Sequence, residues 1–63
     1  MNLQIGDRVR WNTRSGPKIG VVKSTDFGLN NRGQYVQWVN IMTGKNTVKM
    51  TDRNLKMMGM TQE

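Results

Sequence analysis

The side chains that most often carry out enzymatic chemistry are scarce in this chain of 63 residues. It contains no histidine and no cysteine, which removes the commonest general base near neutral pH and the thiolate nucleophile or metal ligand. Two of its four acidic residues, Asp7 and Asp26, stand at expected turns, where aspartate commonly bonds the backbone. We therefore expect no enzymatic activity, no cofactor, no bound metal and no small-molecule substrate.

The basic residues are the chemically distinctive part of the sequence. Ten lysines and arginines oppose four acidic residues and give a formal net charge of +6. Such a charge on a small body attracts polyanions, with nucleic acid first and membrane surfaces or acidic proteins after it. The alternative is a generic solubilising surface, because net charges of about 2–8 are ordinary for small domains.

The spacing of these cations predicts a binding strip on the first pair of strands. Residues opposite each other in an antiparallel pair lie about 5 Å apart, so Arg10 and Lys23 can form one strip with the turn residues Arg14 and Lys18. Phosphates suit such a strip, because bound Lys and Arg displace condensed counterions. The alternative is a solvated face without function. The predicted nucleic-acid-binding residues are Arg8, Arg10, Arg14, Lys18, Lys23, Arg32, Tyr35, Lys45 and Lys49.

The aromatic residues allow two interpretations. An exposed aromatic ring beside cations can stack on unpaired bases, a contact worth about 1–3 kcal/mol per base. Trp11 and Trp38 alternate in step with Val9 and Val36, which favours a place in the core for both tryptophans. Tyr35 lies on the opposite face of its strand and is the better stacking candidate.

Methionines are numerous for this length, six in all. Flexible methionine side chains fill irregular gaps in a core, and they also suit adaptable binding surfaces. We expect Met50 and one of Met57 or Met58 to pack in the core. Met60 and the other one would form an exposed apolar patch for a partner or for self-association.

Positioning these residues requires a set of short strands. The runs RVRW (8–11) and IGVVK (19–23), joined by a polar turn with Ser15, Gly16 and Pro17, predict a β-hairpin within a turn cluster at 12–18. Gly20 inside a strand indicates a bulge, a bend or the close approach of another backbone. The later expected elements are a loop at 26–34, strands at 35–41, 47–50 and 55–58, a hairpin turn at 42–46, and one tight helical turn at 51–54. Within the loop, alternation predicts that Phe27 and Leu29 continue the second strand and cap the core.

Five short strands with turn signals about every ten residues are typical of a small all-β barrel. Closure of the barrel would also remove bare sheet edges, which invite aggregation. We expect a single domain over 1–63, with a core over 3–58 and a frayed tail at 59–63. No run is long enough for a membrane span and MNLQIGDRV does not resemble a signal peptide, so we expect a cytoplasmic protein without membrane contact.

Several of these residues form a familiar pattern. The run Gly6-Asp7-x-Val9-x-Trp11, followed by Gly16 and Gly20-x-Val22, resembles the first hairpin of KOW and Tudor domains. The residues Tyr35-Val36-x-Trp38, Val48 and Leu55 are similar to the later strands of the same barrel. The phrase VRWNTRSGPKIGVV is also similar to the hypervirulence-associated Tudor family. The resemblance implies an all-β, five-stranded SH3-like barrel with one short 3-10 turn before the last strand.

The resemblance also implies a binding role. KOW domains of ribosomal proteins and elongation factors bind RNA or their host machinery, and by resemblance this role falls on the 12–18 turn and the Arg32 loop. The first hypothesis is a module that binds the RNA or DNA backbone with weak sequence specificity. The alternative is an adaptor or small regulator, including one encoded by a phage, that docks on an acidic protein or on a transcription or translation complex. The chain would act as a monomer or as a weak homo-oligomer paired through its edges.

Overall fold

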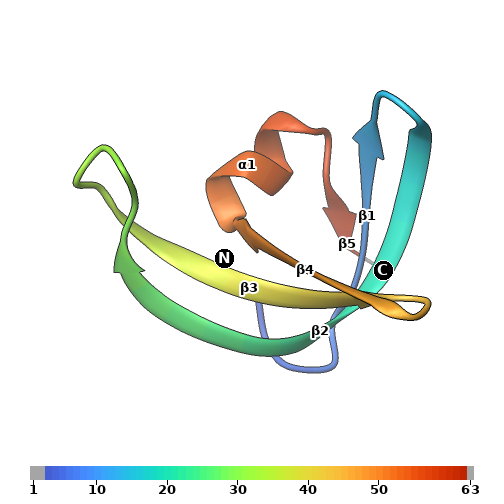
Figure 1. Cartoon of the computed structure of the whole chain (residues 1–63), viewed down its shortest axis with the longest axis horizontal. Helices are drawn as coiled ribbons and strands as arrows, with labels where there is room; N and C mark the ends of the chain where they lie inside the picture. Colours follow the sequence, from blue (N-terminus) through green and yellow to red (C-terminus); the bar gives the residue numbers. More distant parts are fainter. Residues whose placement is uncertain (1–2, 63) are drawn as a thin grey trace.

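The computed structural model describes residues 3–62, which form one antiparallel sheet and one short helix (Figure 1). The strands lie in the order β4-β3-β2-β1-β5, so β4 and β5 are the two edges of an open sheet. The all-β prediction is confirmed, whereas the expected closure is not seen among the described residues. The elements are β1 (Arg8–Thr13), β2 (Gly16–Leu29), β3 (Tyr35–Thr43), β4 (Asn46–Thr51), α1 (Asp52–Met57) and β5 (Thr61–Gln62).

The predicted first hairpin is confirmed, with a tighter turn than expected. β1 pairs with β2 from Arg8↔Val21 to Thr13↔Gly16, so only two residues form the loop. Most of the expected 12–18 turn cluster therefore lies in the ladder. Val9 is buried and the arginines on either side of it are exposed, as strict alternation predicted.

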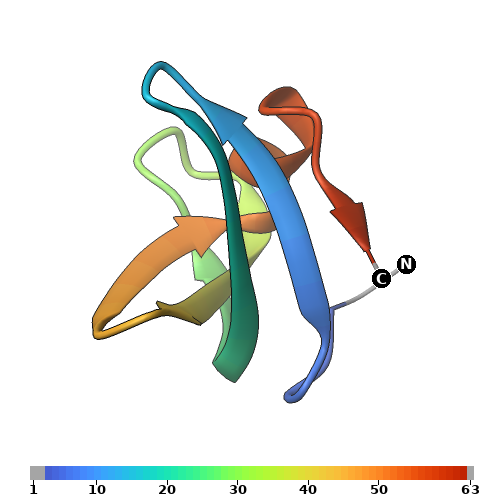
Figure 2. The ribbon, with the colours of Figure 1, turned by 90° about the vertical axis from the view of Figure 1, so that its right-hand side faces the viewer.

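Strand β2 is long and bent, and it joins the two halves of the sheet. Its first half pairs with β1 and its second half with β3 (Figures 1 and 2). The register with β3 shifts between Val22 and Ser24, which marks a bulge at Lys23. At Gly20 the two strands approach so closely that an added Cβ would overlap Ile41 Cγ2 and lie 2.9 Å from the Met42 carbonyl oxygen. Of the three features that the glycine was predicted to mark, a bulge, a bend or a close approach, the structure shows the close approach at Gly20 itself.

The curved sheet packs its core on one side, here called the inner face. Inward residues of β1, β2 and β3 meet Leu3 and the helix residue Leu55 there, and two methionines pack against them. These are Met50, as predicted, and Met60, which was wrongly expected in an exposed patch. Met57 and Met58 are both exposed, so the prediction that one of them packs in the core was wrong. The core cluster is Leu3, Val9, Trp11, Val22, Val39, Ile41 and Leu55.

Strand β3 presents the opposite face from the one predicted. Residues 37, 39 and 41 point into the core, and Trp38 is only partly buried and lies outside the core cluster. Val36 is buried but also lies outside that cluster. The prediction of Trp38 as a core residue was therefore wrong, whereas the prediction for Trp11 was correct.

Gln37 is the polar residue that takes an inward position on β3. Its side-chain Oε1 accepts a hydrogen bond from the Leu3 backbone N–H at 3.0 Å, and its Nε2 donates to the Leu3 carbonyl oxygen at 2.6 Å. Because both polar ends of the buried amide are satisfied, it can lie against the core. This pair of bonds fixes the N-terminal segment and seats the Leu3 side chain.

The segment after β4 is an α-helix rather than a tight turn followed by a strand. Thr51 caps it, since its Oγ1 accepts a hydrogen bond from the Asn54 N–H at 3.1 Å. The helix buries Leu55 and ends before Gly59, which has a φ of +73°. The predicted strand at 55–58 was wrong, and so was the frayed tail over 61–62, which pairs with β1 as β5. Glu63 lies outside the described residues.

A Gly20→Ala substitution should destabilise the fold because its methyl group would meet the β3 backbone. We expect a loss of about 1–3 kcal/mol in the free energy of unfolding, the usual range for overpacking. Urea denaturation measures it. Gly28→Ala is the matched control on the same strand, because its added Cβ would meet nothing closer than Trp38 at 3.9 Å. Equal losses in the two variants would contradict this role for Gly20.

A Gln37→Ala substitution should leave the buried Leu3 N–H and carbonyl without partners. The expected cost is about 1–3 kcal/mol, the penalty for an unsatisfied buried polar group. Hydrogen exchange should show lost protection of the Leu3 amide, and denaturation should show the lower stability. Gln4→Ala, at an exposed position near the same segment, should change neither measurement. Unaltered exchange at Leu3 in the Gln37 variant would refute the assignment.

Candidate nucleic-acid interface

The face of the sheet opposite the core, here called the outer face, carries cations from both ends of the sheet. Arg8 and Arg10 project from β1 on this side, because Val9 between them is buried. Their cross-strand neighbours on β2 are Val21 and Ile19, both exposed. The two arginines therefore border an apolar surface in the middle of the sheet.

The predicted pairing of Arg10 with Lys23 does not occur. Arg10 lies opposite Ile19, and Lys23 lies four residues further along β2, roughly 13 Å away at about 3.3 Å per residue. Lys18 is paired with Trp11, whose side chain points inward. The Lys18 side chain therefore leaves β2 on the inner face, whereas Arg10 projects from the outer face. The strip proposed from the sequence is therefore not a single cationic face.

Trp38 and Lys49 contact each other on the outer face. The Lys49 Nζ lies 5.3 Å from the centroid of the Trp38 ring, within the range of a cation–π contact. Lys49 is exposed, and its neighbour on β3 is Asn40, whose Nδ2 donates to Ser24 Oγ at 2.7 Å. The indole thus holds the lysine over the sheet with its ammonium group open to solvent. Lys49 was predicted from the sequence, whereas its partner was not, because Trp38 was expected in the core.

The β2–β3 loop presents Arg32 from a well-defined backbone. Asn30 Oδ1 accepts hydrogen bonds from the backbone N–H groups of Arg32 and Gln34, both at 2.9 Å. Arg32 then lines a hollow of about 180 Å³ that Trp38 and Asn54 also line. The predicted loop over 26–34 is shorter than expected, since β2 continues to Leu29 and β3 begins at Tyr35.

Helix α1 adds a cation that the sequence did not single out. Arg53 lines an adjoining hollow together with Arg32, so two guanidinium side chains from distant parts of the chain border one depression. Lys56 is a further exposed cation on the same helix. Recognising a basic helix face at 52–57 would have predicted this cation. The helix was not recognised, because a strand was expected at 55–58.

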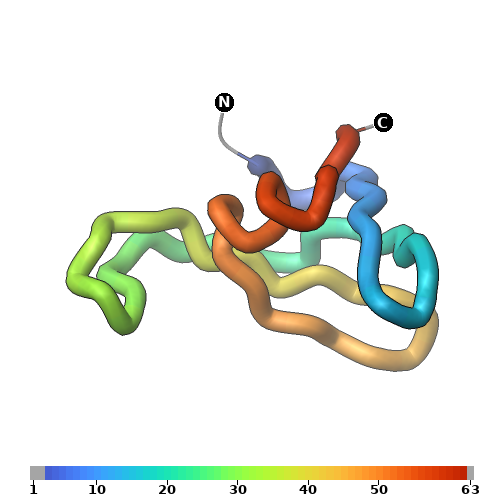
Figure 3. Tube along the Cα trace, turned by 90° about the horizontal axis from the view of Figure 1, so that it is seen from above, coloured from blue at the N-terminus to red at the C-terminus, as the bar shows by residue number. Residues whose placement is uncertain are grey.

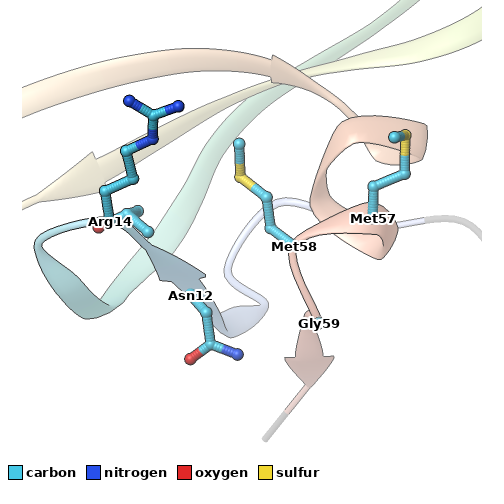
Figure 4. A pocket seen from close by; sticks show the side chains of 6 residues that line it. Asn12, Arg14, Met57, Met58 and Gly59 are labelled. Atoms are coloured by element: carbon cyan, nitrogen blue, oxygen red, sulfur yellow. The ribbon is translucent and has the colours of Figure 1, made fainter.

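Arg14 lies elsewhere, at the β1–β2 turn. It faces Met57 and Met58 across an open hollow of about 660 Å³ that Asn12 and Gly59 also line (Figure 4). The two methionines are the exposed apolar patch of the C-terminal region. The lining of this hollow thus combines one guanidinium group with two apolar side chains.

The remaining predicted residues lie outside the outer-face group. Lys45 is exposed in the two-residue turn between β3 and β4. Tyr35 is exposed, as expected for a stacking residue, but it begins on the core side of β3. The expectation that Phe27 and Leu29 cap the core was wrong, since the two side chains are 45% and 65% exposed.

The three described carboxylates bond to the backbone. Asp7 Oδ2 accepts from the Gln4 N–H at 2.8 Å, and Asp26 Oδ1 accepts from the Phe27 N–H at 2.8 Å. Asp52 Oδ1 accepts from the Arg53 N–H at 2.9 Å. Asp7 thus stabilises a turn and Asp52 the start of the helix. Asp26 was expected at a turn but lies within β2, opposite Trp38.

Within residues 3–62, no three side chains of metal-binding type lie together, and no helix has the length and apolarity needed to cross a membrane. No family model, curated protein or solved structure matches this chain.

Proposed function

We propose that this chain is a non-enzymatic module that binds the backbone of RNA or DNA with weak sequence specificity. The observation that carries the proposal is the outer face, where Lys49 is held over Trp38 and lies on the same side of the sheet as Arg8 and Arg10. Cations on one rigid surface can contact successive phosphates and release their counterions.

The architecture supports assigning the chain to the SH3-like barrels of KOW and Tudor type. Four consecutive antiparallel strands, β1 to β4, are followed by the short helix α1, and β5 returns to pair with β1. The resemblance implied five strands with a 3-10 turn where α1 lies. The strongly bent β2 curls the sheet around the core in the manner of such a barrel (Figure 2). A fold does not determine a function, so the binding role rests on the outer face.

The chemistry of the outer face favours contacts with phosphate over base readout. Ile19, Val21 and Met42, which lie between its cations, have no hydrogen-bonding side chains, and the amide N–H of Asn40 beside Lys49 is already bonded to Ser24. Phosphate contacts fix position without carrying sequence information. We also keep the cytoplasm as the proposed location, since a chain without cysteine suits a reducing compartment.

A second candidate function is docking on an acidic protein through the hollow beside helix α1. Met57 is 85% exposed there, and Arg14 stands across from it. An adaptable methionine surface next to a cation suits an acidic, partly apolar partner. This function would be favoured if binding to nucleic acid were absent and a Met57→Glu substitution abolished the capture of a protein partner.

Binding to a dye-labelled, mixed-sequence oligonucleotide should weaken steeply with salt. Anisotropy titrations between about 50 and 200 mM salt should give a slope of roughly −0.7 to −0.9 per phosphate contact. The Lys49→Gln variant should bind more weakly, with a slope smaller by about one unit. The absence of binding by the unsubstituted protein at low salt would end the proposal.

Lys56→Gln is the charge-matched control for this experiment. Lys56 is exposed on α1 and lies outside the outer face, and its substitution lowers the net charge by the same amount. We expect the slope of this variant to stay close to that of the unsubstituted protein. Equal effects of the two substitutions would mean that net charge alone, and not the outer face, determines binding.

A further inference from the structure

The far ends of β2 and β3 project beyond the core as an arm, defined here as residues 26–37. Figures 1 and 3 show it extending away from α1 and from the β1–β2 hairpin. On the inner side of this arm, Phe27 lies opposite Gln37 and Leu29 lies opposite Tyr35. The N-terminal segment covers this side of the arm only as far as Gln37, which is hydrogen-bonded to Leu3.

Two aromatic rings dominate the uncovered part of the arm. The rings of Phe27 and Tyr35 are stacked, with centroids 6.0 Å apart and an angle of 12° between their planes. Phe27 is 45% exposed and Tyr35 is 72% exposed. Two nearly parallel ring planes are thus held in place by adjacent strands while much of their surface stays in contact with water.

We propose that Phe27 and Tyr35 are a stacking platform for unpaired bases, so that the chain prefers single-stranded nucleic acid over a duplex. This proposal rests on the proposed function and specifies its ligand. Parallel exposed rings match the flat faces that every base offers once it is unstacked, whereas the bases of a duplex are already stacked on each other. Stacking of this kind tolerates any sequence, in agreement with a backbone-directed site.

The loop that joins the two platform strands supplies a cation for the phosphates of the same strand. Arg32 projects from the loop that closes the arm, and Arg53 borders the hollow beside it. Trp38 is the less suitable ring, because Lys49 already lies over it. A strand whose bases stack on the platform can thus keep its phosphates near Arg32.

Other occupants of the arm fit less well. A stable protein interface buries about 800 Å² per partner, and three apolar side chains on a narrow arm supply only part of that area. A second copy of this chain would bring another net charge of +6 to the surface. A polyanion with flat apolar groups complements both the charge and the rings.

The test compares a single-stranded oligothymidine with a duplex of equal length, using the full chain at low salt. We expect tighter binding of the single strand. Tyr35→Leu and Phe27→Leu should each weaken binding of the single strand about fivefold or more, as the loss of one stacked base implies. Neither substitution should change duplex binding by as much as twofold. Tyr35→Phe keeps the ring and should retain the affinity of the unsubstituted protein.

Leu29→Ala is the matched control, since Leu29 lies on the same face without a ring. It should leave single-strand binding unchanged, and circular dichroism should show all four variants folded. Equal affinity for the two oligonucleotides, or equal losses in the leucine and alanine variants, would overturn the platform while leaving backbone binding intact. Failure of the unsubstituted protein to bind either oligonucleotide would overturn the proposed function as well.

Discussion

The close approach of β2 to β3 at Gly20 is the constraint on which the rest of the structure depends. A side chain at this position would overlap Ile41 and press on the Met42 carbonyl group, so only glycine allows the two strands to meet there. The bulge at Lys23 follows within three residues, and together they bend one long strand so that it pairs with β1 and then with β3. The bend turns a flat ribbon into a curved sheet with an inside and an outside.

The two faces created by this bend have different physical roles. The inner face excludes water around Trp11, Ile41 and Leu55, and the buried amide of Gln37 extends this cover to the N-terminal segment. The outer face cannot be covered in so small a chain, so it carries cations and the Lys49–Trp38 contact. The arm lies where the inner cover has ended, and its rings are therefore exposed although they start from the core side of the sheet. The core covers neither place, so the cations of the outer face and the rings of the arm remain exposed to solvent.

Much of the first hairpin could be predicted from the sequence, and much of β3 could not. Strict alternation around Val9 and Trp11 identified the buried side of β1, since both are large and apolar. On β3 the apolar residues Val36 and Trp38 suggested one inner face, but the inward positions include Gln37, whose amide is satisfied by the Leu3 backbone. Such a long-range pairing has no local signal in a sequence.

The helix was missed in the same way. It begins after the cap residue Thr51 and buries Leu55, where a strand had been expected. The cationic strip failed because the two-residue turn between β1 and β2 sets Arg10 opposite Ile19 rather than Lys23.

The central claim is that nucleic acid meets the outer face and the arm of this sheet. Backbone amide chemical-shift mapping with a short single-stranded oligonucleotide at low salt tests it most directly. The account predicts shifts that gather on β1 around Arg10, on β4 around Lys49 and on the arm around Arg32, with little change at Met57 and Met58. Shifts confined to the hollow beside α1, or spread evenly over all exposed cations, would contradict it.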